Sequence, residues 1–103
     1  MHLKDIQARE ALDSEHYWPR HGSMSNLEYL GICLAGEVGE ICNVIKKHSR
    51  GTIDTEELSQ YIGQEAPDVL IYLVMLVEAL DIDLEIAYED KKEYNEQRYR
   101  TST

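Results

Sequence analysis

Apolar residues recur at helical spacing over most of this 103-residue chain. Within residues 25–49 they form one stripe at spacings of four, three and four, namely Leu34, Val38, Ile41 and Ile45. Residues 69–77, VLIYLVMLV, are apolar on every side, as in a helix at the centre of a bundle. Alternation of period two is scarce, and the chain contains neither Asn-Gly nor Asp-Gly. The pattern therefore predicts an all-α protein.

Start and stop signals divide the chain into four helices. Ser25 is followed three residues later by Glu28, which is a capping-box pattern, and Asp54 is followed by Glu57 in the same way. Gly51 is suited to end the helix that Ser25 begins. The expected helices cover residues 3–17, 25–49, 54–80 and 83–98, with the last residues fraying.

Four helices with short connections predict an up-and-down four-helix bundle, formed by residues 1–103 as a single domain. At 11.9 kDa the chain is small, so self-association would help it to bury its apolar surface. Pro67 lies inside the third helix and should bend it, because proline donates no hydrogen bond to the carbonyl of Gly63.

Charge and composition exclude several partners. The net charge of −10 argues against a nucleic-acid polymer or an anionic membrane surface, since both favour clustered Lys and Arg. The apolar run 69–77 is about half the length of a membrane span, and the first residues lack the apolar core of a signal peptide. Cys33 and Cys42 are about 13 Å apart along one helix, too far for a disulfide. We therefore expect reduced thiols and a cytoplasmic protein.

Two pairs of carboxylates border the apolar faces. In GEVGE, residues 36–40, the pair is Glu37 and Glu40, and in the next helix it is Glu65 and Asp68. Carboxylates left unpaired at a core edge would protonate or destabilise the fold. A divalent cation removes that difficulty, and oxygen ligands alone favour Mg²⁺, with Mn²⁺ as a substitute. Either pair by itself is more often a solvated helix edge.

Gly36 and Gly39 weaken the helix that carries the first pair, each by about 1 kcal/mol relative to alanine. We expect this cost to be tolerated if a neighbouring helix or a ligand approaches closely there.

The last helix supplies the opposite charge. Its inner face begins with apolar residues, Leu84 and Tyr88 among them, and continues by helical steps to Lys91, Asn95 and Arg98. These residues would suit a polyphosphate held between metal and cations. A helix end that leaves the bundle for solvent would give the same pattern.

The two acidic pairs, separated by 24 residues and followed by Lys91, Asn95 and Arg98, resemble the MazG-like superfamily of all-α nucleoside triphosphate pyrophosphohydrolases. The similarity covers residues 25–99, and it is strongest to the single-domain dCTP pyrophosphatase and phage MazG-like branch. It rests mainly on LAGEVGEI and on residues 67–99, which include Tyr72 one turn after Asp68.

The resemblance implies Mg²⁺-dependent hydrolysis of a nucleoside triphosphate between the α and β phosphates, giving a monophosphate and pyrophosphate. The substrate would be a deoxynucleotide such as dCTP or dGTP, and the protein a homodimer or homotetramer. All four carboxylates would hold Mg²⁺, and Glu37 or Glu40 would also act as the catalytic base. Lys91, Asn95 and Arg98 would contact phosphate or sugar, and Tyr72 would line the pocket.

Trp18 stands in the segment where members of this superfamily place base-recognition residues. Stacking on the base is one role for it, and packing as a lid is the other. Arg20, His16 and His21 are weaker candidates in the same segment.

Two alternatives remain at this point, and a third, the di-iron bundle, is disfavoured. A phosphoribosyl-ATP pyrophosphohydrolase belongs to the same superfamily and performs a related cleavage. A di-iron carboxylate bundle would need Glu-x-x-His pairs, and no histidine here has a glutamate three residues before it. A non-catalytic acidic helical module, in which the carboxylates are a polar seam, would bind no Mg²⁺.

Overall fold

A computed structural model describes residues 2–17 and 26–101, and all of its regular structure is helical. The four helices are α1 (Leu3–Tyr17), α2 (Asn26–Ser49), α3 (Thr55–Ala79) and α4 (Leu84–Thr101). This confirms the all-α class and the number of helices predicted from the sequence.

The helix ends follow the local signals. Asp54 caps α3 by accepting a hydrogen bond from the Glu57 backbone N–H at 2.8 Å, and Glu57 accepts in return from the Asp54 N–H at 3.3 Å. Gly51 has a φ of 78°, the left-handed conformation expected just after a helix. Ser25, the other predicted cap, lies outside the described residues. The last helix continues to Thr101 and not only to Arg98, and basic residues in its last turn favour this extension.

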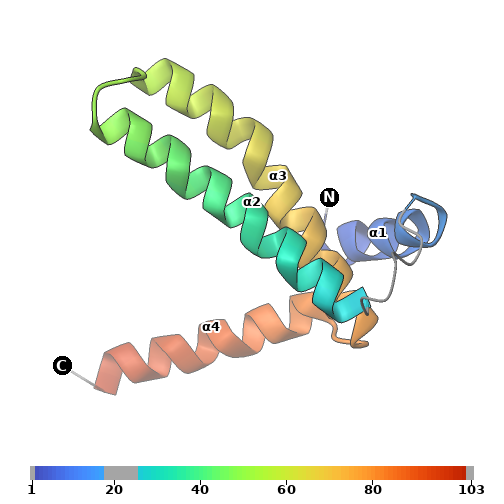
Figure 1. The fold of residues 1–103 in the computed structure, drawn as a ribbon. Coiled ribbons are helices and arrows are strands. Elements are labelled where there is room, and N and C mark those ends of the chain that lie inside the picture. Colours follow the sequence, from blue (N-terminus) through green and yellow to red (C-terminus); the bar gives the residue numbers. More distant parts are fainter. Residues whose placement is uncertain (1, 18–25, 102–103) are drawn as a thin grey trace.

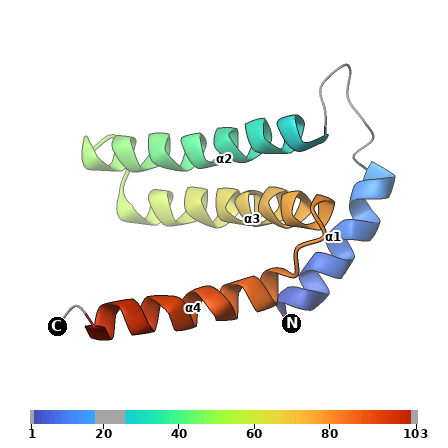
Figure 2. The same cartoon turned by 90° about the horizontal axis from the view of Figure 1, so that it is seen from below.

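α2 and α3 form an antiparallel pair in contact along their length, joined by residues 50–54 (Figures 1 and 2). The buried apolar side chains of the described residues are Leu30 on α2 with Val74 and Met75 on α3. These residues lie toward the end of the pair where α1 crosses α3. The core therefore sits at one end of the hairpin.

α4 leaves the end of α3 at a wide angle and makes its main helix contact with α1 (Figure 1). Within one chain it does not lie along α2 and α3, so the described helices do not close into the expected up-and-down bundle. The charge pattern of α4 favours this, because the face that begins with Leu84 turns charged at Lys91.

The open arrangement leaves the chain extended. Its radius of gyration is 16.8 Å, whereas a compact domain of this length has one of about 13 Å. Its accessible surface is 7844 Å², compared with roughly 6,000 Å² for a compact monomer of this mass. Large apolar side chains are correspondingly exposed, including Ile32 on α2 and Ile86 on α4.

Both cysteines are free, Cys33 partly buried and Cys42 exposed, as expected from their spacing. Among the described residues, no helix combines the length and apolar character that crossing a membrane requires.

Candidate metal centre between the second and third helices

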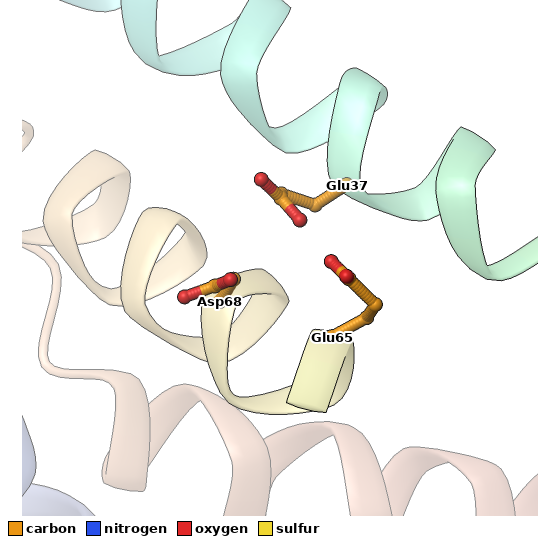
Figure 3. A group of neighbouring side chains, drawn as sticks. All are labelled: Glu37, Glu65 and Asp68. Carbon is orange, nitrogen blue, oxygen red and sulfur yellow. The ribbon is translucent and has the colours of Figure 1, made fainter. Parts of the chain in front are cut away.

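Three of the four predicted carboxylates converge between α2 and α3. Glu37 points from α2 toward α3, where Glu65 and Asp68 face it from adjacent turns (Figure 3). One carboxylate oxygen from each lies within 4.8 Å of those from the other two. The three-residue spacing puts Glu65 and Asp68 on one helix face, and the antiparallel packing of α2 brings Glu37 to the same point.

One buried oxygen atom of this cluster has no hydrogen-bond donor among the described residues. Glu37 Oε2 is buried and accepts no hydrogen bond from any described residue. A buried carboxylate oxygen without a donor is costly unless a cation balances it. The donor set here is oxygen only, which is the chemistry that Mg²⁺ and Mn²⁺ prefer. The residues present therefore fit a hard divalent ion.

Glu40 lies one turn after Glu37 and interacts with the same cluster. Its hydrogen bond with Glu65, and the negative charge of Glu65, raise the pKa of the Glu40 carboxyl above its ordinary value. A hydrogen bond with Glu37 raises the pKa of Glu65 in the same direction. Glu40 and Glu65 thus hold their protons more tightly than ordinary glutamates do, because other carboxyls lie close to them.

Tyr72 lies near this group and interacts electrostatically with Glu37. Burial is the main cause that raises the pKa of the Tyr72 phenol to about 12, and the neighbouring Cys33, Tyr29 and Glu37 raise it further. The phenol therefore stays protonated at neutral pH and can donate a hydrogen bond.

Tyr29 was not among the residues predicted for the site. Cys33 also hydrogen-bonds with Tyr29, and this raises the pKa of the Tyr29 phenol. The signal was present, because Tyr29, Cys33 and Glu37 follow one another at steps of four and so share one face of α2.

The predicted phosphate-binding residues are on α4, apart from the α2–α3 hairpin. Lys91 Nζ lies 4.8 Å from the centroid of the Tyr94 ring, a cation–π distance. Since α4 packs mainly on α1, the described chain does not bring Lys91, Asn95 and Arg98 against the carboxylates. Their role in binding stays a prediction.

Trp18, with Arg20 and His21, lies outside the described residues, and so does the side chain of His16. Pro67 is accommodated within α3, which runs unbroken from Thr55 to Ala79.

The two glycines of GEVGE do not serve close packing within the chain. A Cβ built at Gly36 or Gly39 would meet no described atom within 4 Å. The expectation that a neighbouring helix approaches there is therefore wrong for the described residues. The same glycines line an open groove with Cys42 and Asn43.

Comparison with known proteins identifies a relative. The chain is 31% identical over 102 aligned residues to human dCTP pyrophosphatase 1, covering 94% of this chain and 58% of the length of the relative. No family model and no solved structure matches the chain. The match shows distant homology to that MazG-like all-α protein and confirms the resemblance drawn from the acidic pairs.

Proposed function

We propose that this chain, a distant homologue of the MazG-like protein dCTP pyrophosphatase 1, is a nucleoside triphosphate pyrophosphohydrolase. The reaction would be Mg²⁺-dependent hydrolysis between the α and β phosphates, with a deoxynucleotide such as dCTP or dGTP as substrate. The observation that carries the proposal is the convergence of Glu37, Glu65 and Asp68 around a buried carboxylate oxygen that has no described donor.

Glu37, Glu65 and Asp68 would hold the ion, with Glu40 beside them. When bound, Mg²⁺ would supply positive charge that polarises the phosphates and offsets the charge that develops during phosphoryl transfer. The residues contribute four acidic groups, so the site also repels a bare polyphosphate when no cation is present.

Glu40 is our candidate for the catalytic base. Its raised pKa makes it a better proton acceptor near neutral pH than an ordinary carboxylate, and it is exposed enough to meet a water molecule. In the proposed step a water oxygen bonds to the α-phosphorus, its proton passes to Glu40, and the bond from the α-phosphorus to the bridging oxygen breaks. The products are the monophosphate and pyrophosphate.

Tyr72 would donate a hydrogen bond to substrate from beside Glu37, because its phenol remains protonated. Lys91, Asn95 and Arg98 would bind phosphate or sugar from α4. This requires an α4 to lie against the hairpin, either by closure of the same chain or from a second copy.

We also propose that the protein is a homodimer or homotetramer. The excess of accessible surface over a compact monomer is roughly 1,900 Å², which is more than the roughly 800 Å² that each partner contributes to a standard interface. A second copy would cover exposed apolar residues such as Ile32 and Ile86.

The test is to incubate the protein and Mg²⁺ with each common NTP and dNTP, starting with dCTP, and to identify the products. We expect monophosphate and pyrophosphate, and a loss of roughly a hundredfold or more in kcat for Glu40→Gln. Glu93→Gln, an exposed α4 position, is the matched control and should retain activity.

Release of orthophosphate would contradict the proposed cleavage, and full activity of Glu40→Gln would contradict the assigned base. If no nucleotide is turned over and Mg²⁺ does not stabilise the protein, the chain is instead a non-catalytic acidic module.

A further inference from the structure

One side chain of α1 joins the end of α3 to the beginning of α4. The Gln7 side-chain amide nitrogen donates to Glu78 Oε2 at 2.7 Å and to the carbonyl oxygen of Ile82 at 2.6 Å. Its amide oxygen accepts from the backbone N–H of Leu84 at 3.0 Å. Gln7 therefore bonds to the last turn of α3, to the connecting residues, and to the first residue of α4.

These bonds lie at the connection between α3 and α4, whose conformation sets the direction of α4. The main helix contact of α4 is with α1, and the hairpin of α2 and α3 gives it little support (Figures 1 and 2). The connection itself turns through Asp81, which has a left-handed φ of 56°. Two side chains then satisfy N–H groups of the first turn of α4: Gln7 at Leu84, and Asp83 at Ile86 at 3.2 Å.

The chemistry of the junction requires an amide. A carboxamide presents a donor and an acceptor on one planar group, whereas a carboxylate is acceptor-only. Glutamate at position 7 would keep the bond to the Leu84 N–H but would face the Glu78 carboxylate and the Ile82 carbonyl with negative oxygens. Leucine would lose all three bonds at similar size.

We propose that Gln7 is a positioning residue that fixes the direction of α4 relative to α3. Through α4 it sets where Lys91, Asn95 and Arg98 lie, and so how they reach a set of carboxylates, whether on this hairpin or on that of a second copy. The effect on substrate binding rests on the proposed function, but the effect on helix direction does not.

Helix direction can be measured without any substrate. Spin labels at Glu56→Cys on α3 and Glu93→Cys on α4, in a Cys33→Ala and Cys42→Ala background, report the distance between the helices by pulsed electron paramagnetic resonance. Labelled chain is diluted with unlabelled chain so that only distances within one chain contribute. We expect a broader or shifted distance distribution for Gln7→Leu and Gln7→Glu. Gln60 is an exposed glutamine on α3, and Gln60→Leu should leave the distribution unchanged.

Enzyme kinetics test the proposed effect of Gln7 on substrate binding. For the nucleotide that the wild-type chain hydrolyses, Gln7→Leu and Gln7→Glu should raise KM between about two- and tenfold, the effect of one or a few hydrogen bonds. Mn²⁺ affinity, which depends on the hairpin, should stay within about twofold of wild type. Gln60→Leu should change neither value.

Unchanged distance distributions in folded Gln7 variants would overturn the proposal, whether or not the protein is an enzyme. A changed distribution with an unchanged KM would overturn the role in substrate binding. If the wild-type chain hydrolyses no nucleotide, the proposed function fails, and the distance measurement still decides the role of Gln7 in the fold. Circular dichroism and melting curves identify variants that have unfolded. If Gln7→Leu and Gln7→Glu are among them, Gln7→Asn provides the second test: its amide is too short to keep all three bonds, so the distance distribution should broaden or shift relative to wild type. An unchanged distribution in folded Gln7→Asn would overturn the proposal.

Discussion

Glu65 belongs to a carboxylate cluster that should lower the stability of the metal-free protein and bind a divalent ion. Its hydrogen bond with Glu37, its burial, and the charges of Glu37 and Asp68 raise the pKa of its carboxyl, whereas its hydrogen bond with Glu40 lowers it by less. Like charges at such distances disfavour the ionised state unless a cation is present. We therefore expect the carboxylates that would bind the metal to lower the stability of the metal-free protein.

Glu65→Gln is therefore expected to have opposite effects with and without Mg²⁺. Without the ion it removes a charge from the cluster, so the melting temperature should rise by a few degrees. With the ion a ligand is lost, so Mg²⁺ or Mn²⁺ affinity should fall roughly tenfold or more. Melting curves and calorimetric titration measure the two effects, with Glu93→Gln as control; a lower melting temperature without Mg²⁺ would contradict the repulsion.

The raised pKa values of Glu40 and Glu65 also predict how stability depends on pH. A carboxyl whose pKa is higher in the folded than in the unfolded state holds more protons when folded, so the free energy of unfolding falls as pH rises through this range. We expect the metal-free protein to lose stability from this cluster as the pH rises above the range in which an ordinary carboxyl titrates.

Saturating Mg²⁺ should flatten or reverse that dependence, because it binds the deprotonated carboxylates. Urea unfolding at several pH values, with and without Mg²⁺, measures it. The Glu65→Gln variant should show a weaker dependence than wild type, and an equal dependence would place its origin elsewhere in the chain.

At the scale of the helix, the glycines of GEVGE affect the stability of α2 and do not serve packing against another described helix. Because a Cβ at Gly39 meets no described atom within 4 Å, Gly39→Ala should raise the free energy of unfolding by about 1 kcal/mol. Gly51→Ala should instead lower it by a similar amount, since Gly51 has a positive φ of 78°. Urea unfolding of both variants tests the contrast. Destabilisation by Gly39→Ala would show that a ligand or second copy approaches this face.

Local signals explain why the helices were predictable. The Asp54 capping box, Gly51 and the apolar periodicity each act within a few residues, and the structure reproduces them. The pairing of Glu37 with Glu65 and Asp68 was predictable for a similar reason, because residues 50–54 leave α2 and α3 only an antiparallel arrangement.

The direction of α4 was not predictable in this way. It depends on a contact between Gln7 and residues more than seventy positions later, and α1 carries only a weak apolar stripe. A contact made by a single polar side chain leaves no periodic pattern in the sequence from which it could be predicted. The sequence therefore allowed a closed bundle that one chain does not form.

At the scale of the whole molecule, the exposed apolar residues predict self-association. Light scattering coupled to size exclusion should give two or four times the chain mass of 11.9 kDa. Ile32→Asp, at a side chain that is 60% exposed, should shift the mass toward one chain, whereas Gln60→Asp should not. A wild-type mass of one chain would contradict the proposed oligomer.

The short connection between α2 and α3 also has a consequence for the order of folding. All four carboxylates lie on this one hairpin, which closes through residues 50–54, whereas α1 and α4 meet only when the two ends of the chain come together. Closing a short loop costs less entropy and occurs sooner than closing a long one. We expect Mg²⁺ to accelerate refolding in stopped-flow experiments, because the ion can stabilise the hairpin before the ends of the chain dock; an effect on unfolding alone would mean that the metal centre forms last.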